Sequence, residues 1–182
     1  KSLLSTVFDE IYLGMDLFKE MWQAEPVFKL KKGLIEDEKV VLENDVKTFL
    51  KKKFGNKIGI ASGRPRKAAI KTLKDLLGNF FNPESSFFID DAYVRSKEQW
   101  LGKPNSFLIE QVIKSLKVKS CLYVGDSYED VLMVKNTRKL GYEVGFVGVY
   151  GFSLDMKNFI QKFMEADADA ILPSVNDLKF LF

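Results

Sequence analysis

The amino-acid sequence predicts an α/β fold built on a parallel sheet with helices on both faces. From about residue 58 onward, short apolar runs alternate with longer segments in which apolar residues recur at helical spacing. Glycine, asparagine and proline separate these segments, as expected where strands and helices end. Strands that alternate with helices in this way pair in parallel, because each crossover helix carries the chain back across the sheet. We therefore expect an open, doubly wound, Rossmann-like core.

The individual elements follow from the same periodicities. The predicted strands are the apolar runs at residues 58–61, 86–89, 121–124, 144–149 and 170–172. Apolar residues at helical spacing predict helices at about residues 40–54, 69–77, 109–116, 129–140 and 156–164. In an open sheet of this kind ligands bind beyond the carboxyl ends of the strands, so the residues that follow each run are candidates for a site.

The N-terminal residues predict a helical segment that is separate from this core. Apolar side chains at helical spacing predict one amphipathic helix over residues 4–23. Its apolar side holds Phe8, Ile11, Tyr12, Met15, Phe18 and Trp22, and its polar side holds Asp9, Glu10, Asp16 and Lys19. Residues 23–33 lose this period and contain proline and glycine, which predicts a loop. We therefore expect a helical portion at residues 1–36 and an α/β core at residues 37–182.

Composition narrows the class of protein. Of the 182 residues 46% are hydrophobic and 29% charged, which is ordinary for a globular protein. The sequence has no long apolar run and no secretory leader pattern, and its single cysteine, Cys121, has no partner for an internal disulfide. We expect a cytoplasmic protein with no membrane partner. The net charge of +3, with acidic and basic residues mixed, does not indicate a nucleic-acid surface. Oligomeric state is not determined by these features.

The complete absence of histidine restricts the chemistry. It excludes Ser-His-Asp and Cys-His nucleophiles, histidine general bases and histidine-containing zinc sites within this sequence. Carboxylates, lysine, arginine and hydroxyls are left as candidate functional groups.

Three segments that follow predicted strands carry such groups. After the first strand comes Ser62-Gly63-Arg64, in which a hydroxyl, backbone N–H groups and a helix start offer donors to a phosphate. The same residues are also those of an ordinary helix cap. Further along, Lys103 is held out of the next helix by Pro104, and an ammonium there can neutralise a phosphate or a carboxylate. An isolated loop lysine is more often simply solvated.

The third segment is Gly125-Asp126-Ser127-Tyr128-Glu129-Asp130, directly after an apolar strand. Asp126 and Asp130 are four residues apart, so both carboxylates can point to one place across a helical turn. Carboxylate oxygens are the ligands that Mg²⁺ prefers, together with waters and a substrate phosphate. Acids in the first turn of a helix are the alternative explanation for either residue alone.

Ser62, Lys103 and the Gly-Asp-Ser-x-x-Asp run resemble the second, third and fourth signature motifs of the haloacid dehalogenase superfamily, in order and in strand context. The resemblance covers residues 37–182 and implies a phosphatase with a helical cap, of which residues 1–36 would be the second half. It implies an aspartate nucleophile, a phosphoaspartate intermediate and a small phosphorylated metabolite as substrate. It also implies that Ser62, Gly63, Arg64 and Lys103 bind the substrate, with Ser62 and Lys103 at its phosphate. Lys103, Ser62 and Asp126 would be the catalytic residues; Asp126 would bind Mg²⁺, and Asp130 would bind or support the metal.

The first motif of that family, an apolar strand ending in Asp-x-Asp, is absent upstream of Ser62. Asp9 follows three residues that resemble a strand end, but it lies on the polar side of the predicted helix. Because the chain starts at Lys1 and not at methionine, we expect the nucleophile upstream of Lys1. The strand that carries it would be central to the sheet.

Several alternatives to a phosphohydrolase stay open at this point. They are a phosphosugar mutase of the same family, a non-catalytic binding or regulatory protein that lost the first motif, a receiver-like signalling domain, and dehalogenase chemistry. The position of the acids late in the sequence disfavours a receiver domain, and a metal-ready acid couple disfavours dehalogenation.

Overall fold

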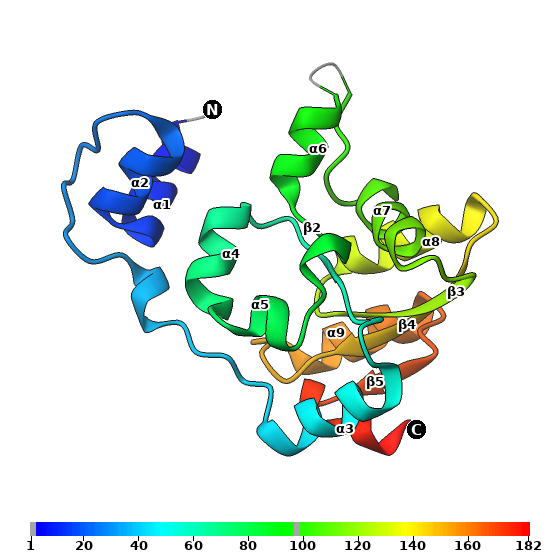
Figure 1. Ribbon diagram of the computed structural model, residues 1–182. Coiled ribbons are helices and arrows are strands. Elements are labelled where there is room, and N and C mark those ends of the chain that lie inside the picture. Colours follow the sequence, from blue (N-terminus) through cyan, green and yellow to red (C-terminus); the bar gives the residue numbers. More distant parts are fainter. Residues whose placement is uncertain (1–2, 97–98) are drawn as a thin grey trace.

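The polypeptide forms an N-terminal helical segment and an α/β core, described here by a computed structural model over residues 3–96 and 99–182. The N-terminal segment contains α1 (Leu3–Leu13), α2 (Met15–Trp22) and the short 3-10 helix η1 (Leu34–Asp37). In Figure 1 helices α1 and α2 stand to one side of the core, and an extended stretch leads from them to α3 (Asn44–Phe54). We call residues 3–38 the cap segment. The domain boundary near residue 36 stays a prediction.

The core alternates strands and helices along the chain. Its elements are β1 (Ile60–Ala61), α4 (Arg66–Leu73), α5 (Leu76–Asn79), η2 (Pro83–Ser85), β2 (Ser86–Phe87), α6 (Ile89–Arg95), α7 (Phe107–Leu116), β3 (Ser120–Gly125), α8 (Tyr128–Lys139), β4 (Glu143–Val149), α9 (Met156–Glu165), β5 (Ala170–Leu172) and η3 (Val175–Phe180). All strand pairs are parallel, which confirms the predicted α/β class. Across the described ranges, no helix is both long and apolar enough to span a bilayer.

The strands form two separate parallel sheets. In one, β1 pairs with β2, with Ile60 opposite Ser86; in the other, the order is β3-β4-β5, with Ser120 opposite Glu143. The sequence predicts the strands but does not show this division. Among the described residues, one edge of β1 and one edge of β3 pair with no other strand.

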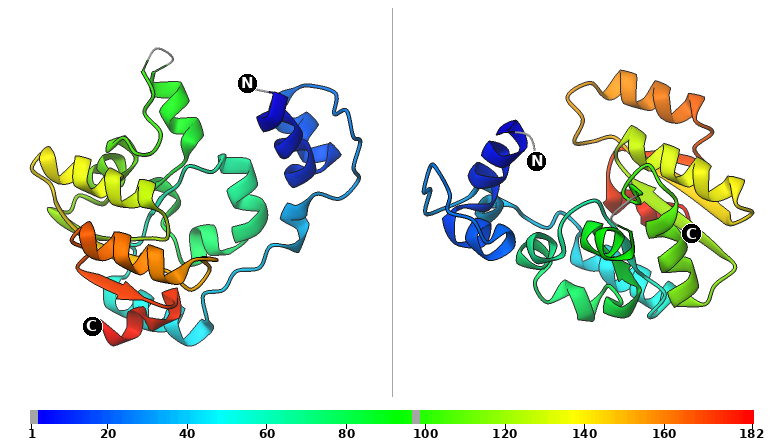
Figure 2. Two further views of the ribbon diagram at one scale, coloured as in Figure 1. Left: turned by 180° about the vertical axis from the view of Figure 1, so that it is seen from behind. Right: turned by 90° about the horizontal axis from the view of Figure 1, so that it is seen from above.

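Helices cover both faces of the sheets. On one face the core includes side chains of α6, α7, α8 and α9, with Phe146 and Phe163 fully or almost fully buried. On the other face α3 and η3 pack together over β4 through Val46, Val147 and Leu178. Figure 2 shows this layering from two further sides. Helices on both sides are what a parallel sheet requires, because its strands are apolar on both faces.

The N-terminal helix is broken, so the prediction of one helix over residues 4–23 is wrong. Gly14 separates α1 from α2 with φ at 74°, a conformation that glycine adopts without strain. Its backbone touches that of Gly33: a Cβ on Gly33 would lie 2.3 Å from the Gly14 nitrogen. This close approach of two segments, which the sequence pattern does not reveal, explains the break.

The predicted faces of this helix are also wrong in part. Glu10 was expected on the polar surface, but it is buried, and its Oε2 accepts hydrogen bonds from the Val27 and Phe28 N–H groups at 2.8 and 2.9 Å. Conversely, Phe8 and Ile11 are exposed. Glu10 thereby satisfies the backbone of the predicted loop, which has no regular structure of its own.

Three core elements differ from their predicted bounds. The predicted helix at 69–77 ends at Leu73, because Lys74 has φ at 49°. The apolar side chain of Ile70 in this helix is exposed, although the apolar period suggests that it faces the core. The predicted strand at 86–89 ends at Phe87, and the following residues form α6, which the sequence did not predict. Helix α3 begins at Asn44, four residues later than the apolar pattern suggested.

The cap segment docks on α4. Leu13, Phe18 and Ile35 form a small hydrophobic cluster with Ala68, which is fully buried although it belongs to the core. Exposed ion pairs flank this contact, Lys67 with Glu20 and Lys71 with Glu36, both at 2.7 Å. Exposed pairs add little free energy, so burial of the apolar cluster holds the cap segment in place.

Replacing Leu13 with alanine tests this docking. Leu13 is buried, so we expect Leu13→Ala to lower the free energy of unfolding by about 2–5 kcal/mol. Leu4, on the same helix, is exposed, and Leu4→Ala should cost less than about 0.5 kcal/mol. Urea unfolding followed by fluorescence measures both; similar losses in the two variants would contradict the packing described.

Candidate functional site

A buried ion pair links two of the predicted motifs. The Lys103 Nζ lies 2.5 Å from the Asp130 Oδ1, and their side chains are 18% and 2% exposed. Lys103 comes from the loop before α7, where Pro104 follows it, and Asp130 comes from the first turn of α8. The loop lysine is therefore not a freely solvated one. It is held against the end of β3.

Asp130 also organises the loop between β3 and α8. Its Oδ2 accepts hydrogen bonds from the Asp126 N–H, the Ser127 N–H and the Ser127 hydroxyl, at 3.1, 3.0 and 2.8 Å. Gly125 leaves room for this carboxylate, because a Cβ there would lie 2.6 Å from the Asp130 Cβ. Burial by itself raises the pKa of Asp130, but the Lys103 charge and these donors outweigh it, so the pKa lies below its ordinary value. Asp130 is thus held as a carboxylate.

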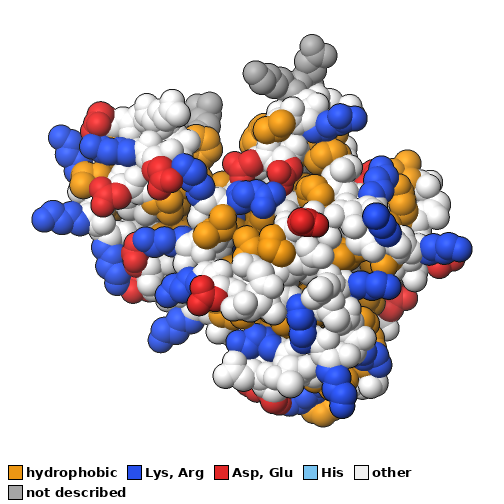
Figure 3. Space-filling model, in the orientation of Figure 1, with side chains coloured by type: hydrophobic (Ala, Val, Ile, Leu, Met, Phe, Trp, Pro, Cys, Tyr) orange, Lys and Arg blue, Asp and Glu red, His pale blue; other side chains and the backbone are white. Residues whose placement is uncertain are grey.

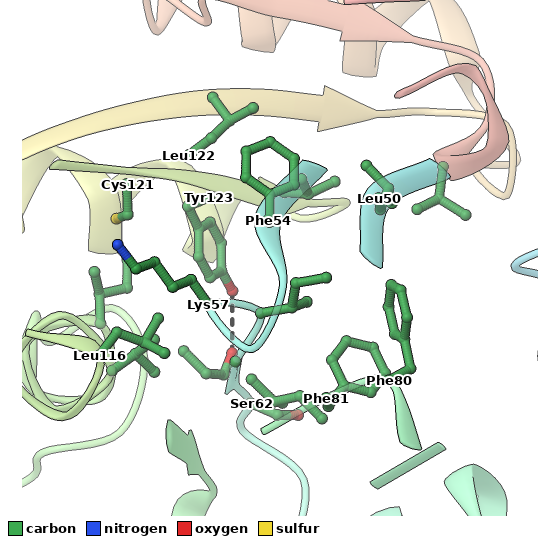
Figure 4. A pocket seen from close by; sticks show the side chains of 18 of the residues that line it. Leu50, Phe54, Lys57, Ser62, Phe80, Phe81, Leu116, Cys121, Leu122 and Tyr123 are labelled. Atoms are coloured by element: carbon green, nitrogen blue, oxygen red, sulfur yellow. Dashed lines mark hydrogen bonds between the residues drawn. The ribbon is translucent and has the colours of Figure 1, made fainter. Parts of the chain in front are cut away.

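Tyr123 connects the pair to the other sheet, and the sequence analysis did not single it out. Its hydroxyl lies 2.8 Å from the Asp130 Oδ1 and 3.2 Å from the carbonyl oxygen of Ala61, to which Figure 4 draws the bond. Burial and the Asp130 charge raise the pKa of Tyr123 well above its ordinary value. The hydroxyl therefore stays a donor. The sequence does contain a signal for this role, because Tyr123 is the one side chain with a hydroxyl in the apolar run at residues 121–124, two residues before Gly125.

The loop that contains Ser62 lies beside the ion pair of Lys103 and Asp130. The Ser62 N–H donates to the Phe87 carbonyl at 3.0 Å, which extends the β1–β2 pairing to the start of the loop. The Ser62 hydroxyl accepts from the Arg64 N–H at 3.2 Å. A Cβ on Gly63 would lie 4.0 Å from the Lys103 Cδ, so the lysine stem passes beside this glycine. The structure thus brings Ser62, Gly63, Lys103 and Asp130 to the carboxyl ends of β1 and β3.

Asp126 differs from Asp130 in being exposed. It follows β3 directly and its backbone is fixed by Asp130, while its carboxylate faces solvent. In the described parts of the chain, no group of three or more cysteine, aspartate or glutamate side chains could hold a metal ion. Mg²⁺ is usually bound by one or two carboxylates with waters and phosphate oxygens. Asp126 fits such a role, whereas both Asp130 oxygens are already occupied by protein donors.

Arg64 turns away from these residues toward the cap segment. Its Nη2 donates to the Tyr12 hydroxyl and, at 2.8 Å, to the Glu38 Oε2; Thr72 also donates to Glu38. Burial and the bond to Glu38 raise the pKa of Tyr12 to about 12. Burial raises the pKa of Glu38 too, but bonds from Thr72, Tyr12 and Arg64 lower it overall. Arg64 therefore ties the loop of Ser62 to the cap segment.

The space-filling view of Figure 3 shows an open notch between the cap segment and α6. Lysine and arginine side chains on this face are scattered among acidic ones and form no single basic patch. The cap segment and α6 thus stand on two sides of this notch, and the cap segment is joined through Arg64 to the loop of Ser62.

Comparison with known proteins agrees with this arrangement. A family model described as a haloacid dehalogenase-like hydrolase matches residues 18–137, which is more than half of the chain. The chain belongs to the haloacid dehalogenase-like hydrolase family. The matched region contains Ser62, Lys103, Asp126 and Asp130 and extends from α2 into α8. No curated protein and no solved structure matches the chain.

The role of Asp130 in this hydrolase-family chain can be tested by its stability. Asp130→Asn removes one charge of a buried ion pair. It also replaces one acceptor oxygen with an NH₂ group that faces other hydrogen-bond donors, so the free energy of unfolding should fall by about 3–5 kcal/mol at pH 7. Glu129→Gln, at the exposed neighbouring position, should cost less than about 0.5 kcal/mol.

The same variant should alter the response to acid. Because the folded-state pKa of Asp130 is lowered, its stabilisation is present above the unfolded-state value of about 3.9 and is lost as the pH falls through the lower folded-state value. Asp130→Asn should therefore lose less stability than the parent chain between pH 5 and the acid limit. Parallel urea titrations at several pH values measure this, and equal acid slopes would be inconsistent with the buried pair.

Proposed function

We propose that the chain is the main part of a Mg²⁺-dependent phosphohydrolase that acts on a small phosphorylated metabolite through a phosphoaspartate intermediate. The observation that carries this proposal is the Lys103 ammonium, held by Asp130 beside the Ser62-Gly63 loop. A fixed cation, a hydroxyl and backbone N–H groups at the carboxyl ends of parallel strands suit a phosphoryl group. Family membership supports hydrolysis in general, and the phosphate specificity is our inference.

The residues would divide the work of binding the phosphoryl group. Ser62 and the Gly63 N–H would donate to its oxygens, and Lys103 would neutralise its charge. Asp126 would supply a carboxylate to Mg²⁺, which when bound supplies further positive charge for the phosphate. Asp130 would hold Lys103 and the Asp126 backbone in place. Arg64 would couple the phosphate loop to the cap segment and contact the substrate only if it leaves Glu38.

The nucleophile is proposed to lie upstream of Lys1. Asp130 is a poor nucleophile, because all its acceptor positions are directed at protein donors. An aspartate oxygen would attack phosphorus while the ester P–O bond breaks, and the leaving alkoxide would take a proton from water. A water molecule would then attack the phosphorus of the aspartyl phosphate, which releases phosphate and restores the aspartate. The proposed substrate is a small phosphorylated metabolite. The location of the protein in the cytoplasm stays a prediction.

The alternatives differ in their products. A mutase would return an isomerised sugar phosphate with little free phosphate, and a non-catalytic protein would bind phosphate esters without turnover. The exposed Asp126 favours catalysis over binding alone, since a carboxylate beside a phosphate site is repulsive unless a cation joins them.

Turnover of a panel of phosphate monoesters with Mg²⁺, by the protein together with its upstream residues, tests the proposal. We expect free phosphate to be released, and Lys103→Met to reduce kcat/KM by at least about 100-fold, because a fixed cation at the reacting group is lost. Lys139→Met, at an exposed position in the last turn of α8, should leave turnover unchanged. Folded protein that releases no phosphate from any ester would refute the proposed activity.

A further inference from the structure

A small pocket lies between helix α6 and the loop that leads to Lys103. Its volume is about 230 Å³. Ile89, Ala92, Tyr93 and Ser96 line it on the α6 side, and residues 99–102 line it on the loop side. Pockets for drug-sized ligands usually have volumes of about 300–1,000 Å³. This pocket is therefore of a size for one small ring.

Two half-exposed aromatic side chains belong to this pocket. Tyr93 of α6 is 52% exposed, and Trp100 of the loop is 56% exposed. Their rings meet edge to face, with centroids 5.7 Å apart and planes at 70°. Tryptophan is highly buried in most folded proteins, so a pair of this kind beside a pocket leaves aromatic surface without a partner. A further planar ring could stack on one of these rings and meet the edge of the other.

The loop side of the pocket is fixed against Lys103. The Trp100 indole N–H donates to the Lys103 carbonyl oxygen at 3.0 Å. A Cβ on Gly102 would lie 2.5 Å from the Trp100 Cζ2, so the indole packs directly over this glycine. Gly102 and Lys103 are consecutive, which places their Cα atoms about 3.8 Å apart. The pocket therefore begins one residue from the lysine that we assign to the phosphate.

The α6 side of the pocket touches the phosphate loop as well. The Ile89 N–H donates to the Arg64 carbonyl oxygen at 3.3 Å, and Arg64 lies two residues after Ser62. The Ile89 Cδ1 would lie 2.6 Å from a Cβ on Gly102, so α6 and the loop meet at this glycine. The pocket thus borders both segments that bring donors to the phosphate.

The walls of the pocket suit an uncharged ring. Among the described residues that line it, none carries a charge, and Ile89 and Leu101 are apolar. The Ser96 hydroxyl oxygen already accepts a hydrogen bond from the Gln99 N–H at 2.9 Å. A second charged group of a ligand would lose its hydration here without gaining an ionic partner. A planar apolar ring would instead gain contact with both aromatic side chains.

We propose that this pocket binds the alcohol part of the substrate and that this part carries a planar aromatic ring. The proposal rests on the proposed function, because the phosphate of the same ester would lie at Ser62, Gly63 and Lys103. The substrate class is then a phosphate monoester in which few bonds separate an aromatic ring from the phosphate. Tyr93 and Trp100 determine this specificity by contact with the ring.

Nonhydrolysable phosphonates test the proposal, because their carbon–phosphorus bond replaces the ester bond. Residues 1–182 are titrated with Mg²⁺ present and with inorganic phosphate, benzylphosphonate or cyclohexylmethylphosphonate. The two organic ligands carry rings of similar size, and only the benzyl ring is planar. In NMR spectra, the Ser62 and Gly63 amide signals report on the phosphate loop, and the Trp100 indole N–H signal reports on the pocket.

We expect all three ligands to shift the Ser62 and Gly63 signals. Benzylphosphonate should also shift the Trp100 indole signal, whereas inorganic phosphate should not. The Kd of benzylphosphonate should be about fivefold lower than that of cyclohexylmethylphosphonate, because only a planar ring forms aromatic pairs. Equal Kd values for these two ligands, or an indole signal that benzylphosphonate leaves in place, would overturn the proposal and leave the phosphate site intact.

Variants of the two aromatic residues complete the test. Trp100→Ala and Tyr93→Ala should each raise the Kd of benzylphosphonate about fivefold and leave that of inorganic phosphate unchanged. Trp100→Phe retains a ring and should keep most of the affinity for benzylphosphonate. Phe180→Ala removes a 75% exposed aromatic side chain of η3 and should change neither Kd.

The Tyr93 variant separates binding of the ring from support of Lys103. Trp100 also bonds to the Lys103 carbonyl, so Trp100→Ala alone could weaken phosphate binding through the loop. Tyr93→Ala that binds benzylphosphonate as the parent chain does, or that loses inorganic phosphate equally, would overturn the proposal. Ser62 and Gly63 signals that respond to none of the three ligands would reject the phosphate site and this proposal together.

Discussion

The ion pair between Lys103 and Asp130 is the interaction on which the arrangement of the site depends. A buried pair gains little net free energy unless its remaining hydrogen-bonding positions are satisfied. Here Asp130 is surrounded by Lys103, Tyr123, Ser127 and the Asp126 backbone, which come from three different segments. Through Tyr123 the pair also reaches Ala61 on the other sheet. The pair therefore connects the loop before α7 with the start of α8, and a phosphate bound there would meet groups that are already in position.

The cap segment is joined to this site through one loop. Arg64 lies two residues after Ser62 and is bound to Glu38 and Tyr12, while Ala68 of the following helix is buried against Leu13 and its neighbours. Movement of the cap segment would therefore act on the Ser62 loop directly. A cap that closes over a site excludes water and selects the substrate, and this physical link is the route by which it would influence phosphate binding.

Local periodicity was sufficient for much of the fold. The strand at residues 170–172 has the predicted bounds, and no end of α8, α9 or β4 differs from its predicted position by more than one residue. Each of these elements combines a clear apolar period with turn residues at its limits. The failures arise from contacts between distant segments. The contact of Gly14 with Gly33 breaks a helix whose period is continuous, and Glu10 is buried because the backbone of residues 27 and 28 needs an acceptor. The division of the sheet likewise depends on which strands are neighbours, which periodicity does not encode.

The structure brings several of the residues that the sequence singled out close together, and most of their contacts were not expected. The order of Ser62, Lys103 and Asp130 was enough to expect them near one another, and the structure brings them to the carboxyl ends of β1 and β3, which belong to two different sheets. The sequence could not show that Asp130 would accept hydrogen bonds from several protein donors while Asp126 stays exposed, since the two acids are only four residues apart at the start of α8. It also could not show that Tyr123 would bridge the sheets or that Arg64 would turn to the cap segment, because both side chains meet partners far away in the chain.

We infer that the loop after β1 and the loop between β3 and α8 form a single anion site. An NMR titration with inorganic phosphate in the presence of Mg²⁺ tests this most directly. The account predicts that the amide signals of Ser62, Gly63, Asp126 and Ser127 shift together, with one apparent Kd, and that Lys103→Met abolishes all of these shifts. Shifts confined to one of the two loops, or shifts that persist unchanged in Lys103→Met, would contradict it.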